Sequence, residues 1–372
     1  MLDDNSFQTF VYNNILWRAK PGAPTTLQKS LDWGANWIDL KSNFTYNVGD
    51  IIVFENGNIL VEQDPDSDST VGSTQPSSLY LSTDGGITFG GSPVLTMSNA
   101  GSLFFFSYDV KGNTAFIGEY GKYDAVYVYR TVNGGVSFDI VFTHPTSGSL
   151  SSHIHRVYMD KWVDGLVFVS LGDNSGNRGV YYTTNNGGTW TRIISATSWQ
   201  PTWIDSNRTY VFFGEDGGGT NGAIHRALKS KIIAGTFVQA ADYETVYEAT
   251  EDTRGNFEEV SWYAGAVDDG GRIYFGSLSY GQDSTFNGGD SLLLFSDDDG
   301  DNWEILATYN ALSGSTSHGC TFLSKQQRDG KLYMTVNQVG GATRDVLTIN
   351  TLLLGDRIRS SGRIKSGTRI KS

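Results

Sequence analysis

The feature that most constrains the fold is an eight-residue pattern that occurs five times in 372 residues. Each copy has a hydroxyl residue, any residue, Asp or Asn, any residue, Gly, two further residues and an aromatic ring. The copies are SLDWGANW, STDGGITF, TVNGGVSF, TTNNGGTW and SDDDGDNW, which begin at Ser30, Ser82, Thr131, Thr183 and Ser296. The starts are 52, 49, 52 and 113 residues apart. This eight-residue repeat therefore predicts a structural unit of about fifty residues.

The long interval spans about two periods and contains SKIIAGTF, which begins at Ser230. This segment keeps the first Ser and the final Thr-Phe, but it has lost the Asp and the Gly of the pattern. We interpret it as a decayed sixth copy.

Each copy lies between runs of alternating apolar residues, as in GVYYTTNNGGTWTRIIS, which predicts a β-hairpin. The polar side chain at the third position can accept hydrogen bonds from N–H groups of its own turn, and the Gly supplies a positive φ. The aromatic ring is expected to be buried beside the next hairpin. These roles are structural and need no catalysis; we assign them to Asp32, Asp84, Asn133, Asn185, Asp298, Trp37, Phe89, Phe138, Trp190 and Trp303.

The repeat resembles the Asp-box, also called the BNR repeat, of sialidase-like β-propellers, over roughly residues 1–354. The resemblance implies an all-β fold of four-stranded blades, which suits a chain with 45 Gly and 13% aromatic residues. The pattern of strands and turns gives a seven-bladed β-propeller, with blades at about 1–45, 46–98, 99–147, 148–200, 201–250, 251–312 and 313–354. Six blades with an irregular closure also fit. In that family the boxes lie away from the substrate, so they indicate the fold rather than the function.

The second predicted domain is a basic C-terminal arm, residues 355–372, after the propeller of residues 1–354. In GDRIRSSGRIKSGTRIKS, Arg-Ile-Arg/Lys-Ser recurs every six residues, and the arm has six positive charges and one negative. The remaining chain has a net charge of −18, which argues against nucleic acid as a partner. We expect the arm either to bind other virion proteins or other copies of the chain, or to be a flexible basic tail held near the acidic propeller by charge alone.

Cysteine usage and hydropathy limit the location. The single Cys320 cannot form an intramolecular disulfide. The N-terminus has no signal-peptide pattern, and no apolar run approaches the roughly 20 residues that span a bilayer. We expect an extracellular or virion protein without membrane insertion.

In a propeller, the loops between second and third strands and the entries to first strands meet on one face, where a ligand would bind. Rings beside carboxylates suit sugar recognition, although the tryptophans could instead fill space between blades. His153 and His155 point to the same side of a strand, where they could bind zinc or hydrogen-bond loop backbone. The candidate ligand-binding residues are Glu119, Tyr120, His153, His155, Arg178, Trp199, Trp203, Trp262 and Tyr263.

No cofactor is expected. The acidic DPDSD segment at Asp64 alternates carboxylates in a way that suggests calcium, but it lacks the Gly and Glu of an EF-hand loop. Sialidases use an arginine triad, and the nearest match to its first segment, WRAKPG at Arg18, has the wrong residues after the Arg. Another glycoside hydrolase could pair Asp173 with Glu215 or Asp216. We therefore expect a non-catalytic recognition or structural propeller of a virion that binds a cell-surface glycan or protein, with a sialidase-like glycoside hydrolase as the alternative.

Overall fold

A computed structural model describes residues 10–12, 14–65, 76–98, 107–120, 125–145, 153–172, 178–195, 200–216, 222–249, 260–280, 291–309, 317–323, 331–337 and 344–350. The predicted arm lies outside these residues. The chain divides into two compact units, Asp3–Pro201 and Thr202–Ser372. In the described residues no helix is long and apolar enough to cross a membrane.

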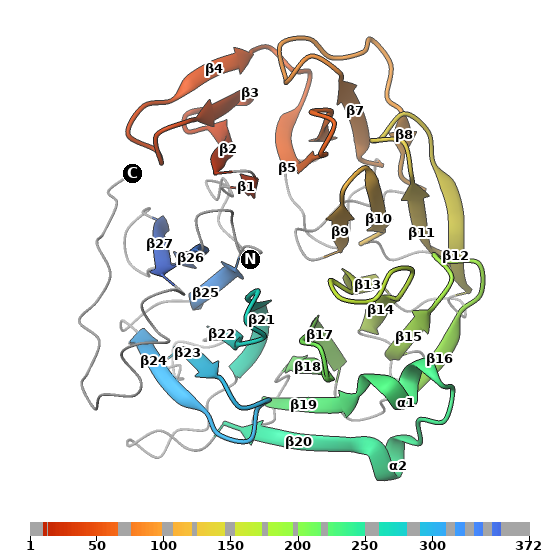
Figure 1. Cartoon of the computed structure of the whole chain (residues 1–372). Coiled ribbons are helices and arrows are strands. Elements are labelled where there is room, and N and C mark those ends of the chain that lie inside the picture. The colour runs from red at the N-terminus through yellow and green to blue at the C-terminus, as the bar shows by residue number, and fades with distance from the viewer. Residues whose placement is uncertain are drawn as a thin grey trace. The chain divides into compact units, whose positions relative to one another are not determined.

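The first unit contains four antiparallel sheets, each of four strands that are consecutive in the chain (Figure 1). The first two sheets are β1 (Phe10–Tyr12), β2 (Ile15–Lys20), β3 (Ala23–Ser30) and β4 (Ile38–Lys41), then β5 (Asn47–Val53), β6 (Ile59–Asp64), β7 (Ser78–Ser82) and β8 (Leu95–Thr96). The next two are β9 (Tyr108–Lys111), β10 (Thr114–Gly118), β11 (Ala125–Thr131) and β12 (Asp139–Pro145), then β13 (His153–Met159), β14 (Val167–Gly172), β15 (Gly179–Thr183) and β16 (Thr191–Ser195).

A fifth four-stranded sheet, nearly all in the second unit, comprises β17 (Gln200–Ser206), β18 (Tyr210–Asp216), β19 (Ala223–Leu228) and β20 (Tyr243–Glu248). Two short helices, α1 (Lys229–Ile233) and α2 (Gln239–Asp242), connect β19 to β20. The last sheet has seven strands: β21 (Val260–Val267), β22 (Ile273–Tyr280), β23 (Ser291–Ser296), β24 (Glu304–Tyr309), β25 (Ser317–Leu323), β26 (Lys331–Asn337) and β27 (Arg344–Asn350).

The last sheet joins two strand groups through β22, whose final residues pair with β25. The described residues thus form six sheets, and the predicted count of seven blades is not confirmed. The all-β class is confirmed. Strands in which apolar and polar residues alternate supply the core. The second strands of two sheets, β6 and β14, are buried along their whole length, as expected for strands covered on both faces.

Glycines let neighbouring sheets approach within each unit. A Cβ at Gly118 would lie 2.5 Å from Ile154 of the following sheet, and a Cβ at Gly214 would lie 2.6 Å from Trp262. Any side chain there would force the sheets apart.

The eight-residue repeat forms the predicted hairpin turn at all five places. Its fourth residue has φ between 56° and 73° and its fifth between 84° and 90°, as in a type I′ turn. The hydroxyl at the first position donates to the Asp or Asn oxygen at the third over 2.7–2.9 Å. That oxygen also accepts the seventh N–H over 2.8–3.1 Å. The structural roles predicted for the polar residue and the Gly are confirmed.

The seventh position completes this network in a way the sequence pattern did not predict. Where the third residue is Asp, its second oxygen accepts a hydrogen bond from an Asn or Thr side chain at the seventh position. Where the third residue is Asn, its amide donates to a Ser or Thr hydroxyl there. The side chain at the seventh position is therefore the donor where the third residue is Asp and the acceptor where it is Asn.

The expected position of the aromatic ring is wrong in one respect. In two later copies the ring packs on the sheet that precedes the repeat rather than on the next hairpin: Trp190 donates its indole N–H to the Val141 carbonyl of β12 over 2.8 Å. Trp303 lies 6.2 Å from Tyr247 of β20, measured between ring centroids, and it is half-buried rather than fully buried.

The repeat glycine meets the same preceding sheet. A Cβ would lie 3.0 Å from Leu40 at Gly86, from Leu60 at Gly135 and from Val141 at Gly187. At Gly300 it would lie 3.1 Å from Phe212. The glycine therefore serves both the turn and the contact between sheets.

The decayed sixth copy does not form a hairpin. Ser230 lies in α1, and strand pairing places Ala227 opposite Val211, where the other sheets have the first hydroxyl residue of the repeat. Without that hydroxyl and the Asp, the chain forms a helical turn, and Gly235 with φ 68° ends it.

Candidate functional site

The predicted ligand face corresponds to the strand ends at which second strands lead into third strands. Many of its loops lie outside the described residues, among them Trp199 and the possible catalytic Asp173. Arg178 is described just before β15, half-buried, and its carbonyl accepts a hydrogen bond from Arg192. The other candidates form one cluster in each unit.

In the first unit, Glu119 follows β10 and is buried. Its carboxylate accepts hydrogen bonds from the N–H and hydroxyl of Ser98, at 2.6 and 2.8 Å, and from the Tyr129 hydroxyl at 2.7 Å. Burial raises the pKa of Glu119, although these hydrogen bonds oppose the shift. The carboxylate joins β10 and β11 to the end of the preceding sheet, which is a structural role.

His153 and His155 do come together, as their spacing predicts. Their Nε2 atoms are 2.7 Å apart, and Nδ1 of His155 lies 3.2 Å from the Pro201 carbonyl oxygen. Because a carbonyl only accepts, His155 carries its proton on Nδ1, and in a neutral pair Nε2 of His153 donates to His155. Both rings are buried, and the Tyr120 ring lies 4.0 Å from the His153 ring, measured between centroids, at a tilt of 42°.

The histidine pair thus follows the alternative of hydrogen bonding to backbone. Gly172 makes room for it, because a Cβ there would lie 2.0 Å from the His155 ring. Among the described residues, no group of three His, Cys, Asp or Glu side chains could hold a metal ion.

Two of the predicted ligand-stacking tryptophans are core residues. Trp203 is 2% exposed and Trp262 is 0% exposed. Trp262 packs edge-on against Phe275 at 6.3 Å, and a Cβ at Gly265 would meet the Trp203 indole at 2.4 Å. These rings fill space between strands, so neither can stack on a ligand.

In the second unit, Glu215 and Asp216 end β18. Glu215 lies 2.7 Å from Nε2 of His225 and also accepts the Ala223 N–H at 3.2 Å. Asp216 accepts hydrogen bonds from the hydroxyls of Ser261 and Tyr263, at 2.6 and 3.2 Å.

Strand register shows that Glu215 and Glu119 occupy equivalent places. Gly118 pairs with Val128, and Gly214 pairs with Ile224, so the glutamate that follows each glycine has the same position. Glu215 is buried and hydrogen-bonded within its own sheet. We therefore assign Glu215 a structural role as well, although its bonds join strands of one sheet, whereas Glu119 also reaches the preceding sheet.

Asp216 and Tyr263 are half-buried, as Tyr120 and Arg178 also are, but these two are joined by a hydrogen bond at one strand end. Tyr263 lies where the register of β21 against β22 shifts, between Ser261 and Ala264. Such a bulge changes the direction of side chains and is common beside functional sites. The pair presents a carboxylate and a phenol hydroxyl at one strand end.

Sequence reasoning missed a buried acidic pair in the first unit. Asp50 and Glu62 are both buried, and the Asp50 N–H donates to a Glu62 oxygen over 3.2 Å. Burial and then the charge of Glu62 raise the pKa of Asp50 well above its ordinary value. The sequence signal was a charged residue inside each of two apolar strands, VGDIIVF and ILVEQD.

This pair lies beside polar residues of two other sheets. Burial raises the pKa of Tyr108, and the charges of Asp50 and Glu62 add to the shift while that of Arg156 opposes it. The register of β5 shifts between Val48 and Ile51, which explains how an acid within an apolar strand turns toward this cluster.

Solved structures similar to the chain show its fold. A GH74 enzyme of Niastella koreensis aligns with a TM-score of 0.57 and 12% identity, over 92% of this chain and 52% of that one. A polysaccharide lyase of family PL25, an ulvan lyase, gives 0.56 and 10% over 94% and 92%. YCF48 from Cyanidioschyzon merolae gives 0.55 and 15% over 90% and 94%.

These structures are β-propellers, so the likeness assigns the β-propeller fold to this chain. The chain spans about half the length of the GH74 enzyme. No family model matches the chain, and no curated protein matches it in sequence.

Proposed function

We propose that the chain is a recognition propeller of the Asp-box type that binds a glycan through the strand ends around Asp216 and Tyr263. The observation that carries this proposal is the half-exposed group in which the Asp216 carboxylate holds the hydroxyls of Ser261 and Tyr263. Each carboxylate oxygen can accept further hydrogen bonds from sugar hydroxyls, and the phenol ring offers an apolar edge.

Carbohydrate as the ligand class also agrees with the names of two neighbours, a GH74 enzyme and a polysaccharide lyase. At 10–12% identity these neighbours support a class of ligand and no particular sugar. Binding without catalysis is favoured because Glu215, the second acid at this place, is already engaged by His225 and the Ala223 N–H.

A glycan array and a panel of fluorogenic glycosides test the proposal with wild type, Asp216→Asn and Tyr263→Phe. We expect binding to at least one glycan family, weakened roughly tenfold in either variant, and no turnover. An array without any binding contradicts glycan recognition.

The alternative is glycoside hydrolysis by the acids at the end of β18. Turnover by wild type that disappears in Glu215→Gln or Asp216→Asn would establish it in place of pure recognition. Glu119→Gln is the matched control, because Glu119 has the equivalent place in another sheet.

We further propose that the protein acts on a virion or outside cells, as a component that meets a cell-surface glycan. The basic arm supports this role by its charge, opposite to that of the rest of the chain, and would attach the propeller to other virion proteins or to other copies.

A further inference from the structure

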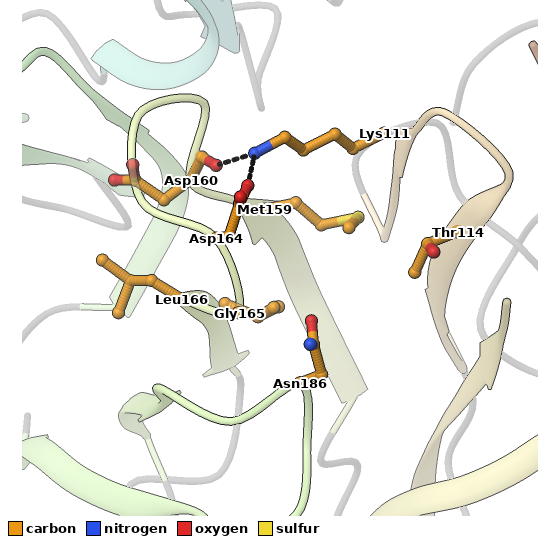
Figure 2. A pocket seen from close by; sticks show the side chains of 9 residues that line it. Lys111, Thr114, Met159, Asp160, Asp164, Gly165, Leu166 and Asn186 are labelled. Atoms are coloured by element: carbon orange, nitrogen blue, oxygen red, sulfur yellow. Dashed lines mark hydrogen bonds and ion pairs between the residues drawn. The ribbon is translucent and has the colours of Figure 1, made fainter.

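A pocket in the first unit opens at the strand ends opposite to the predicted ligand face. It lies between the turn from β9 to β10, the loop from β13 to β14 and the eight-residue repeat that begins at Thr183 (Figure 2). Its volume is about 270 Å³. Pockets for drug-sized ligands begin at about 300 Å³, so this space suits a single ring.

An ion pair stands at the edge of this pocket. The Lys111 ammonium lies 2.6 Å from Oδ1 of Asp164 and 3.4 Å from the Asp160 carbonyl oxygen. The hydrogen bond from Lys111 and its charge lower the pKa of Asp164. The Asp164 side chain is 94% exposed and that of Lys111 is 40% exposed, so a ligand can reach both.

Several polar atoms that line the pocket still have hydrogen-bonding capacity. Lys111 has three N–H donors, of which Asp160 and Asp164 take two. Within the described part of the chain, Oδ2 of Asp164, the side-chain amide of Asn186 and the Thr114 hydroxyl make no hydrogen bond. In Figure 2 the Asn186 amide extends from the turn of the repeat toward the side chain of Met159.

The remaining walls are mostly apolar, and the lining carries one positive charge, on Lys111, and two negative charges, on Asp160 and Asp164. Met159, Leu166 and Val167 are buried core residues whose surfaces bound the space. The Asp160 carboxylate turns away to accept the N–H groups of Trp162 and Val163, each at 2.8 Å. The Lys111 charge is balanced by Asp164, so an anion would have to displace that carboxylate, whereas a neutral ligand need not.

We propose that this pocket binds one neutral sugar ring through a vicinal diol held by Lys111 and Asp164. An ammonium beside a carboxylate offers a donor and an acceptor side by side, and each hydroxyl of a diol is both acceptor and donor. The C–H face of the ring would lie against Met159, which keeps 6% of its surface exposed at the pocket wall. The ligand class rests on the proposed function, but the site is separate from Asp216 and lies on the side that carries the eight-residue repeats.

Met159 provides a direct reporter for the test. The chain has four methionines, so protein labelled with ¹³C-methyl methionine gives few signals, and Met97, in the core around β5–β8, serves as internal control. Methyl mannopyranoside is the diol probe, and cyclohexanol is the matched probe with one hydroxyl. We compare wild type, Lys111→Met and Asp164→Ala with Lys20→Met, because the Lys20–Asp39 pair has the same 2.6 Å distance and a lysine equally exposed at 40%.

We expect the glycoside to shift the Met159 signal at millimolar concentration and leave Met97 unchanged. Affinity should fall roughly tenfold or more in both pocket variants and stay unchanged in Lys20→Met. No shift, an equal shift with cyclohexanol, or full binding by both pocket variants would overturn the inference. If Asp216→Asn abolishes binding on the array and the Met159 signal does not shift, the proposed function stands and the pocket inference fails. If the Met159 signal shifts but no glycan binds on the array, the pocket inference stands and the proposed function fails.

Discussion

At the level of single residues, Asp84, the third residue of the second repeat, has an unusually low pKa. The side-chain hydrogen bond from Thr88, followed by the Thr88 N–H and the Ser82 hydroxyl, lowers the pKa of Asp84 to about 2. Because this pKa is lower in the folded than in the unfolded state, the stability it contributes is complete above about pH 4 and is lost as the pH falls through about 2.

We expect Thr88→Val to raise the pKa of Asp84 toward its ordinary value, because the variant loses the first of these hydrogen bonds. Carboxyl NMR titration measures the change. Ser137→Ala is the control, since the third residue of its repeat is Asn133, which does not titrate. An Asp84 pKa that stays near 2 in Thr88→Val would assign the shift to the backbone N–H groups and the Ser82 hydroxyl.

The buried Asp50 predicts a pH dependence of the opposite sign. Its pKa is raised in the folded state, so the fold is most favoured below about pH 4 and loses stability as the pH rises toward the folded pKa. Asp50→Asn should therefore gain stability over wild type as the pH increases, by about 1–2 kcal/mol at pH 8.

Urea unfolding of Asp50→Asn and wild type, each near pH 4 and pH 8, measures this difference. Asp39→Asn is the matched control, because the hydrogen bond from Lys20 lowers the pKa of Asp39. The stability that this lowered pKa contributes is already complete above about pH 4, so the effect of Asp39→Asn should be nearly the same at both pH values. Equal effects of Asp50→Asn at both pH values would contradict the prediction.

The sequence predicted residue roles well where the hydrogen bonds are local. Asp298 accepts the N–H of Asn302 from its own turn, as the repeat predicts. The role of Trp262 depends on whether a neighbouring strand covers its side of β21, and the role of Asp50 depends on a bulge. Neither the coverage by a neighbouring strand nor the position of the bulge follows from a fixed residue spacing, so the sequence could not predict these two roles.

At the level of elements, the repeat glycine combines two requirements that substitution can separate. Gly135 has a positive φ and lies against Leu60, whereas Gly85 has a positive φ with nothing near its would-be Cβ. We expect Gly135→Ala to destabilise the protein by about 2–4 kcal/mol and Gly85→Ala by about 1 kcal/mol, because only the first forces the preceding sheet away.

Thermal or urea unfolding of both glycine variants gives the comparison. Similar losses of stability for Gly85→Ala and Gly135→Ala would show that the turn conformation alone matters and that the contact with Leu60 adds little.

The elements show why the sixth copy was assigned wrongly from sequence. SKIIAGTF keeps the first Ser and the final Thr-Phe of the repeat, but pairing of β19 with β18 places the equivalent first position at Ala227, three residues before Ser230. Strand register determines where a turn can occur, and a motif that has lost its Asp and Gly no longer indicates that position.

For the whole chain, the contrast of charge makes a prediction about the arm. Residues 355–372 have six positive charges and one negative, against a net −18 for the rest. We expect deletion of the arm to leave a folded propeller that no longer self-associates or enters particles. Sedimentation velocity and particle incorporation measure the effect, and an unchanged oligomer with normal incorporation would eliminate the attachment role.

The chain-level fold was readable because five repeats share one period, and the all-β class and the β-propeller fold followed from it. The number of blades did not follow, because no repeat marks the last strands β25–β27, and β25 pairs with β22 of the preceding group. The repeats therefore predict the sheets that contain them, whereas the arrangement of the last strands depends on pairing between residues far apart in the sequence.

Because each of these repeats contacts an earlier sheet, the contacts also suggest an order in which the sheets fold during translation. On the ribosome, the sheet that receives Gly135 or Gly187 is complete before that glycine is added, and the same holds for Gly300 and β18–β20. At the usual speed of translation, a sheet of some fifty residues takes roughly 3–10 s to emerge. Within each unit the nascent chain can therefore add one sheet at a time, each new turn locking onto a surface that has already formed.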